Sequence, residues 1–150
     1  MLAGDGAAAA AAAARPNFQA ESPDEEALVL GALDELGYAF TGRSRAECRA
    51  RVAGAAGGAS DEAWEVLATI PFDSARKRMT VVARRAGARG GGARVLCKGA
   101  DSIVFARVAA DGYARAGGRA RLDAALGEFA RDGLRTLVLA QRELLSLIHI

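Results

Sequence analysis

The feature that most constrains the fold is a β-hairpin expected between residues 80 and 97. Two β-prone runs, Thr80–Ala83 and Arg94–Cys97, are separated by residues 87–92, which include four glycines. Glycine adopts the positive φ angles that a chain reversal needs. Antiparallel pairing returns the chain alongside itself, so we expect Phe72, before the first run, and Lys98, after the second, to lie near the same open end of the hairpin.

Basic residues gather at that open end. The run Arg76-Lys77-Arg78 follows Phe72, and Lys77 and Lys98 are the only lysines in a chain that otherwise uses arginine. A lysine ammonium is a compact point charge, whereas a guanidinium is a planar fork, so the two are not equivalent at a tight site. An aromatic ring beside such cations suits a flat base that carries phosphates. The alternatives are a solvated charge run and a strand-end lysine.

Three helices are expected outside the hairpin. Ser22 and Glu25 form a capping box around Pro23, which predicts a helix that runs to about Glu35 and is stopped by Gly37. A second helix is expected from Asp101 to about Ala109. The third, residues 119–132, has apolar side chains at i, i+3, i+4 and i+7 and is closed by Gly133.

Further strands complete a mainly antiparallel sheet flanked by helices, an α/β (α+β) fold class in which the central hairpin excludes regular βαβ alternation. Strands are expected at residues 38–41, 63–70 and 134–140, and the 22–35 and 119–132 helices are expected to back the sheet. Residues 43–58 are expected to be a short helix or a loop. Pro71 cannot donate to a ladder, so the strand before it should fray just before Phe72 and leave that ring at an element edge. The alternative is a core aromatic.

Length and composition predict one domain, residues 17–144, in a chain of 150 residues. Residues 1–16 form an alanine-rich, low-complexity segment that we expect to be disordered. With 51% hydrophobic residues, many of them alanine, and 5% aromatics, the core should be thin and rich in small side chains. Cys48 and Cys97 give neither a disulfide framework nor a metal-ligand spacing, so we expect no metal site, and Cys97 is expected to be a small buried hydrophobe. No apolar run is long enough to span a bilayer.

Four motifs occur in order between about residues 18 and 144. They are Glu21-Ser22-Pro23-Asp24-Glu25-Glu26-Ala27-Leu28-Val29, Phe72-Asp73-Ser74-Ala75-Arg76-Lys77-Arg78-Met79, Lys98-Gly99-Ala100-Asp101 and Gly133-Leu134-Arg135-Thr136-Leu137-Val138-Leu139-Ala140. Together they resemble the cytosolic nucleotide-binding domain of P-type ATPases, and the Arg-Lys-Arg-Met form resembles the phospholipid flippases among them. Residues 145–150 no longer resemble the family, and we expect them to be a tail outside the domain.

The resemblance implies that the chain binds ATP. It places the ring of Phe72 on adenine, and it implies that Glu25 accepts a hydrogen bond from the exocyclic amine of adenine. Alternatively, Glu25 serves only the helix cap. The remaining residues that it implies for the pocket and the phosphate chain are Ser74, Lys77, Lys98, Arg135 and Thr136. No catalytic residue is expected in this chain.

The resemblance also implies a larger parent. Family members transfer phosphate to an aspartate in an Asp-Lys-Thr-Gly-Thr motif with Mg²⁺, and this sequence contains no such motif. We therefore expect ATP binding without turnover. The partners expected are the phosphorylation and actuator domains and transmembrane helices of a membrane-embedded parent, with this domain on the cytosolic side, and an accessory subunit is left open. Alanines stand where the family has a cysteine-bearing stretch, so the domain is expected to lack its first segment.

Two alternatives stay open. One is the corresponding domain of a cation-transporting P-type ATPase. The other is an arginine-rich nucleic-acid binder that uses residues 84–92 as a basic arm. The balance of eighteen acidic against twenty basic residues disfavours that arm, and we expect no nucleic acid among the partners.

Overall fold

A computed structural model describes residues 22–54, 57–87 and 92–144, and the chain divides into two compact units, Met1–Phe40 and Thr41–Ile150. The first unit contains α1 (Pro23–Leu36). The hydroxyl of its N-cap Ser22 accepts a hydrogen bond from the amide of Glu25 at 3.3 Å. Gly37 ends the helix with a φ of 68°, a conformation that glycine adopts without a side-chain penalty. The expected start and stop of this helix are confirmed.

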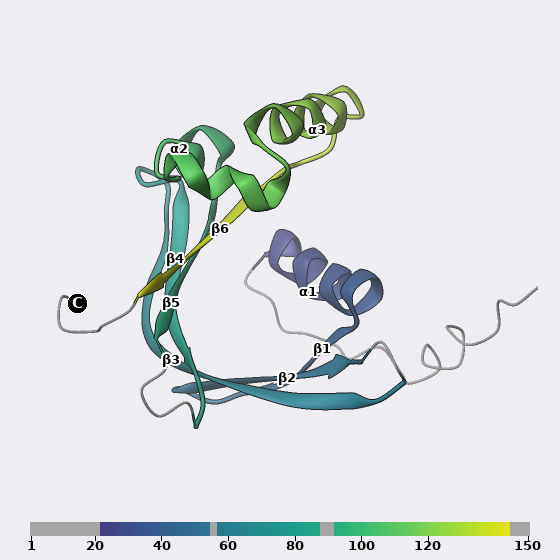
Figure 1. Cartoon of the computed structure of the whole chain (residues 1–150), viewed down its shortest axis with the longest axis vertical. Coiled ribbons are helices and arrows are strands. Elements are labelled where there is room, and N and C mark those ends of the chain that lie inside the picture. The colour runs from purple at the N-terminus through teal and green to yellow at the C-terminus, as the bar shows by residue number, and fades with distance from the viewer. Residues whose placement is uncertain (1–21, 55–56, 88–91, 145–150) are drawn as a thin grey trace, which may run out of the picture. The chain divides into compact units, whose positions relative to one another are not determined.

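A single six-stranded sheet has its strands in sequence order, and the pairs from β2 to β6 are all antiparallel. The mainly antiparallel sheet expected from the sequence is therefore confirmed, as Figure 1 shows. The strands are β1 (Tyr38–Arg43), β2 (Glu47–Ala53), β3 (Ala59–Asp73), β4 (Arg78–Arg85), β5 (Ala93–Gly99) and β6 (Val138–Leu144).

The expected hairpin is β4 and β5, and its register matches the two β-prone runs. Thr80 lies opposite Cys97 and Ala83 opposite Arg94. The hydroxyl of Thr80 also lies 3.8 Å from the sulfur of Cys97, which is only half-buried. At the start of the turn, Gly87 has a φ of 77°, and residues 88–91 lie outside the described part of the chain.

Two expectations about the strands before the hairpin are wrong. Residues 47–53 form β2, not a short helix or loop, because Arg49 and Arg51 alternate with smaller, half-buried residues along one strand. The strand expected to fray before Phe72 instead runs on to Asp73. The pairing of β3 with β4 shifts register between Ile70 and Asp73, so Pro71, which cannot donate a ladder hydrogen bond, is accommodated in an irregularity.

The segments after the hairpin are also displaced from their expected bounds. The helix expected over residues 101–109 is shorter, since α2 covers Asp101–Phe105 and a 3₁₀ helix, η2, covers Ala110–Ala116. The last strand begins at Val138 rather than at residue 134. Its start follows from pairing with β5, in which Val138 lies opposite Gly99, a constraint that local sequence does not contain.

The helices of the second unit do not cover the sheet as expected. α2 packs against β5 and β6, whereas α3 (Arg119–Arg131) packs on η2 (Figure 1). The guanidinium of Arg119 lies 4.0 Å from the ring centroid of Phe105, which joins α3 to α2. The expectation that the 119–132 helix backs the sheet is thus wrong, because its packing partner is η2.

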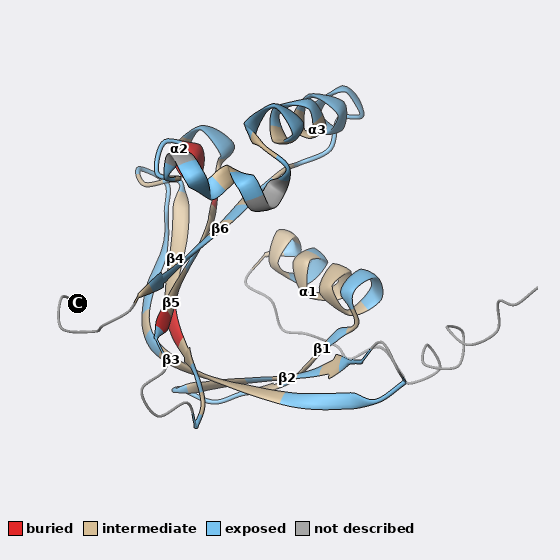
Figure 2. Cartoon of the chain, viewed as in Figure 1, coloured by how far each residue is buried: buried red, intermediate tan, exposed pale blue. Residues whose placement is uncertain are grey.

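The core is small, as the alanine-rich composition predicts. Figure 2 shows its few buried residues in the β4–β5 hairpin and in α2. Among the described residues, the buried apolar side chains are Val82, Ala83, Ala93, Val104 and Phe105. Within the same residues, no helix has both the length and the apolar character needed to cross a bilayer.

Candidate functional site

Four strands bring the motif residues together at one end of the sheet. Residues that lie opposite one another in β3, β4, β5 and β6 form a single cross-strand row at this end. The row consists of Asp73, Arg78, Gly99 and Val138. We call it the motif end. Phe72 directly precedes this row in β3 and Lys98 directly precedes it in β5, so the two lie near the same open end, as the hairpin predicts.

A tight turn, residues 73–78, connects β3 to β4 at the motif end. One carboxylate oxygen of Asp73 accepts hydrogen bonds from the amides of Ala75, at 2.8 Å, and Arg76, at 3.0 Å. The carbonyl oxygen of Asp73 accepts from the amide of Lys77 at 2.7 Å. Aspartate commonly orders turns in this way, by bonding the backbone two or three residues ahead. We call this segment the Asp73 turn.

Lys77, in the Asp73 turn, touches the Lys98 motif. Lys77 has a φ of 52°, the only positive φ of a non-glycine residue among those described, and its carbonyl oxygen accepts from the amide of Ala100 at 3.1 Å. A Cβ added to Gly99 would lie 2.5 Å from that oxygen and 2.7 Å from the Cβ of Arg78. Only glycine fits there. The missing side chain of Gly99 thus admits the backbone of the chain itself.

Phe72 carries the most exposed phenylalanine ring among the large hydrophobic residues, with 64% of its surface accessible. The expectation of an aromatic at an edge rather than in the core agrees with this exposure. The guanidinium of Arg76 donates to the carbonyl of Pro71 at 3.4 Å, and that of Arg78 donates to the carbonyl of Arg76 at 3.2 Å. Two of the three basic residues thus brace the turn, while the side chain of Lys77 is exposed.

Lys98 shares a sheet face with apolar side chains. It lies opposite Met79 on one side and Leu139 on the other, and directly opposed residues of antiparallel strands point to the same face. Lys98 and Met79 are half-buried, whereas Leu139 is 66% exposed. An exposed apolar surface beside an ammonium group is compatible with a ligand that has both a flat ring and negative charge.

The remaining candidates lie in other parts of the chain. Arg135, which is exposed, and Thr136, which is half-buried, belong to the segment between α3 and β6 and not to the start of a strand. They come shortly before Val138, which is part of the motif end. Ser74 is exposed in the Asp73 turn. Glu25 lies in the first turn of α1, in the first unit, while the other six candidates lie in the second.

Sequence reasoning missed two residues at the motif end. Asp73 was read only as part of a motif, although an Asp-Ser pair directly after a strand is a known signal for a side-chain-capped turn. Leu139 was considered only as part of the strand expected at residues 134–140, and it is largely exposed. Its position on the face of Lys98 could be found only from the register of β5 and β6.

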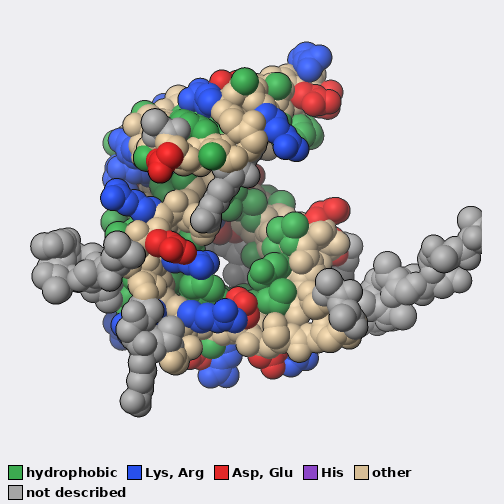
Figure 3. All heavy atoms as spheres, in the orientation of Figure 1, with side chains coloured by type: hydrophobic (Ala, Val, Ile, Leu, Met, Phe, Trp, Pro, Cys, Tyr) green, Lys and Arg blue, Asp and Glu red, His purple; other side chains and the backbone are tan. Residues whose placement is uncertain are grey.

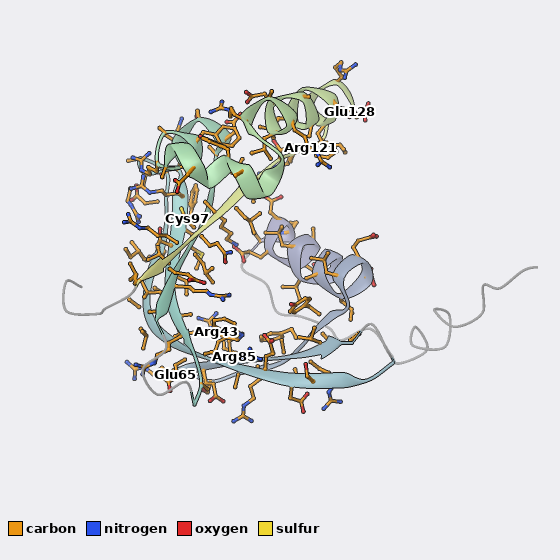
Figure 4. The ribbon with its side chains drawn as sticks, in the orientation of Figure 1. Arg43, Glu65, Arg85, Cys97, Arg121 and Glu128 are labelled. Atoms are coloured by element: carbon orange, nitrogen blue, oxygen red, sulfur yellow. The ribbon has the colours of Figure 1, made fainter. Side chains whose placement is uncertain are left out.

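Away from the motif end, several arginines lie in ion pairs across neighbouring strands. The pairs are Arg51 with Asp61, Arg84 with Glu65, Arg85 with Glu62 and Arg94 with Glu143. Figure 3 shows Lys and Arg side chains among Asp and Glu side chains on the face that it draws, and Figure 4 labels Arg85 at the end of β4 opposite to the motif end. Arg84 and Arg85, which begin the proposed basic arm, are thus paired with carboxylates, and this weakens the nucleic-acid interpretation.

Asp61 and Cys48 are among the groups of the second unit whose pKa is shifted. The hydrogen bond from Arg51, with its charge attraction second, lowers the pKa of Asp61. Burial raises the pKa of the Cys48 thiol, and the nearby charge of Arg43 opposes this only in part. Among the residues that the structure describes, no three His, Cys, Asp or Glu side chains are grouped so that they could hold a metal ion.

Comparison with known proteins adds independent information. A family model described as the cytoplasmic domain N of P-type ATPases matches residues 15–147. "Probable phospholipid-transporting ATPase 5" of Arabidopsis thaliana is 42% identical over 129 residues, which cover 85% of this chain and 10% of that protein. "Phospholipid-transporting ATPase DNF2" of Saccharomyces cerevisiae is 36% identical over 139 residues, and "Phospholipid-transporting ATPase DNF1" of Chaetomium thermophilum is 39% identical over 127 residues. Each of these matches covers 85% of this chain and 8% of the relative.

Proposed function

Because this chain belongs to the P-type ATPase family, as its cytoplasmic domain N, we propose that it binds ATP at the motif end and presents the nucleotide to a phosphorylatable aspartate elsewhere in its parent protein. The observation that carries the proposal is the joining of the Phe72 motif to the Lys98 motif, through the hydrogen bond from Ala100 to Lys77 and the close packing of Gly99. Phe72, Lys77 and Lys98 each directly precede a residue of the motif-end row, and the Phe72 ring is exposed.

Each candidate residue has a proposed part in the binding. Phe72 stacks on adenine, a contact worth about 1–3 kcal/mol by analogy with other aromatic–base stacks. The cationic side chains form charge-assisted hydrogen bonds with the phosphates, which are stronger than neutral ones. The cations proposed for this role are Lys77, Lys98 and Arg135. Ser74 and Thr136 contribute hydroxyl groups. Glu25 accepts a hydrogen bond from the exocyclic amine of adenine, an assignment that rests on its motif match alone.

The parent is proposed to be an ATP-driven phospholipid translocase of a membrane, with this domain on the cytosolic side. Support comes from the relatives, which are named as phospholipid-transporting ATPases and of which this chain spans only 8–10%. The same names favour this reading over a cation-transporting relative. The proposed partners are the phosphorylation and actuator domains and transmembrane helices of the parent, and an accessory subunit remains a further candidate.

The chain's residues supply binding and orientation but no nucleophile. Phosphoryl transfer to an aspartate needs that aspartate and a metal ion, which neutralises charge on the phosphates. This sequence has no Asp-Lys-Thr-Gly-Thr motif, so we propose that the acceptor and most ligands of Mg²⁺ belong to other domains. The 150-residue chain should then bind ATP without hydrolysing it.

Titration of the 150-residue chain with ATP and, separately, with inorganic tripolyphosphate tests this proposal. We expect a dissociation constant for ATP on the order of 1 mM, because a stacked base and a few exposed contacts leave about 4 kcal/mol after the costs of association. Tripolyphosphate, which lacks the base, should bind at least tenfold more weakly. Equal binding of the two would contradict the stacking role of Phe72. The proposal would be overturned if a folded chain showed no binding at an ATP concentration roughly ten times the expected dissociation constant.

A further inference from the structure

We propose that Asp73 is a positioning residue of the nucleotide site, which orders the Asp73 turn and thereby holds the Lys98 motif against Lys77 of that turn. The inference rests on the proposed function and deepens it. Asp73 is exposed, and its carboxylate bonds the backbone of its own turn. It therefore acts on the nucleotide through the residues that it holds in place.

The first step is the ordering of the turn. The carboxylate of Asp73 satisfies the amides of Ala75 and Arg76 at 2.8 Å and 3.0 Å, and its carbonyl oxygen satisfies that of Lys77 at 2.7 Å. Three successive backbone donors thus point back at a single residue. Without the side-chain acceptor, two of these donors would turn to solvent and the turn would have more accessible conformations.

The second step passes from the turn to the neighbouring strand. Lys77 is held at a φ of 52°, a region that side-chain-bearing residues seldom occupy. In this conformation its carbonyl oxygen meets the amide of Ala100 at 3.1 Å and lies against Gly99, where no Cβ would fit. Lys98 has ladder partners in Met79 and Leu139, and the two residues that follow it are also held against the backbone of Lys77.

The third step concerns the two lysines themselves. Lys77 is exposed at the end of the turn, and Lys98 lies on the sheet face that also carries Leu139. If the backbone of Lys77 became mobile, both ammonium groups would have to be ordered when ATP binds. Ordering side chains and loops on binding weakens affinity, whereas an ordered site avoids that cost. The carboxylate of Asp73 would therefore raise ATP affinity without contacting ATP.

Three substitutions separate this role from an effect of charge. Asp73→Asn keeps an oxygen at the same place and removes the charge. Asp73→Glu keeps the charge, but its extra methylene moves the carboxylate out of register with the two amides. Asp73→Ala removes both. We expect the dissociation constant for ATP to stay within about twofold for Asp73→Asn and to rise about fivefold or more for both Asp73→Glu and Asp73→Ala.

A second readout needs no nucleotide. In Asp73→Ala and Asp73→Glu, the amide proton of Ala100 should exchange with solvent faster, although it lies in another motif. It should keep its wild-type exchange rate in Asp73→Asn, and the amide of Leu126 in α3 serves as the internal reference. A purely local role for Asp73 would change the amides of Ala75 and Arg76 and leave that of Ala100 as it was.

The outcomes are distinct from those that test ATP binding itself. The inference is overturned if Asp73→Asn weakens binding as much as Asp73→Ala, because charge rather than the acceptor would then matter. It is also overturned if Asp73→Ala leaves the Ala100 amide unchanged. A wild-type chain that does not bind ATP would refute the proposed function, while the exchange of the Ala100 amide would still decide whether Asp73 orders the motif end. If Asp73→Ala does not fold, the comparison of Asp73→Asn with Asp73→Glu decides the inference.

Discussion

The backbone amide of Ala100 donates a hydrogen bond to the carbonyl oxygen of Lys77 at 3.1 Å, and this bond joins the two motifs that contain the chain's only lysines. Ordinary ladder pairing ends one residue earlier, at the pairing of Arg78 with Gly99. The contact extends the hairpin beyond its ladder and into the turn.

Phe72→Ala should weaken ATP binding about tenfold, because the proposed stack is worth 1–3 kcal/mol. The free energy of unfolding should change by less than about 0.5 kcal/mol, since the ring is 64% exposed and contributes little to the core. Phe129→Ala in α3 is the matched control, because that ring is 45% exposed and lies outside the motifs. Spectral titration with ATP and urea unfolding measure the two effects. Equal ATP affinity of the two variants would argue against stacking on Phe72.

Lys77→Gly and Lys77→Ala both remove the ammonium group but differ in the backbone. Glycine adopts the φ of 52° without strain, whereas a side-chain-bearing residue is disfavoured there by roughly 1–2 kcal/mol. Both variants should bind ATP more weakly than the wild type. Urea unfolding should show Lys77→Gly to be more stable than Lys77→Ala by about 1 kcal/mol. A more stable alanine variant would mean that the turn does not hold residue 77 in the left-handed region.

Gly99→Ala should destabilise the chain by about 1–3 kcal/mol, the range found when atoms are forced into a packed site. The added Cβ would meet three atoms of Lys77 and Arg78 at 2.5–2.9 Å, two of them backbone atoms. Gly127→Ala provides the control. That glycine lies within α3 with no atom near its added Cβ, so the substitution should stabilise the helix by about 0.5–1 kcal/mol. Denaturant unfolding should show a lower free energy of unfolding for Gly99→Ala and a higher one for Gly127→Ala. An unchanged free energy of unfolding in Gly99→Ala would contradict the close approach of Gly99 to Lys77 and Arg78.

Asp61 should titrate below the ordinary aspartate range, because Arg51 lowers the pKa of its carboxyl. A carboxyl whose pKa is lower in the folded than in the unfolded state stabilises the fold above its unfolded pKa. That contribution should be lost as the pH falls through the lowered pKa. Arg51→Gln should return the pKa of Asp61 towards about 3.9. Carboxyl chemical shifts followed against pH measure this, and an identical midpoint in the variant would exclude the pairing.

Local chemistry was enough to predict some elements from the sequence. The hairpin follows from two β-prone runs around a glycine-rich turn, and its register agrees residue for residue between Thr80–Ala83 and Arg94–Cys97. The start of α1 follows equally from Ser22 and Pro23, whose capping preferences are strong. In each case the signal lies within a few residues of the structure that it specifies.

Other elements depended on contacts between distant residues. β2 was missed because its half-buried positions hold small side chains, such as Cys48 and Ala50, so alternation with arginine was a weak signal. The register shift that accommodates Pro71 belongs to the pairing of β3 with β4, and the start of β6 follows from its pairing with β5. The gathering of the Phe72 and Lys98 motifs could be inferred from the hairpin, whereas the bond from Ala100 to Lys77 could not.

The most direct test of the central claim is an ATP titration of the 150-residue chain followed by amide NMR, with Phe72→Ala and Lys98→Ala beside it. We predict shifts that cluster at the motif end, around Phe72, Lys77 and Lys98, and extend to Arg135 and Thr136. They should weaken strongly in both variants. A well-dispersed spectrum that does not respond to ATP, or responses confined to residues far from the motif end, would contradict the assignment of a nucleotide site to this end of the sheet.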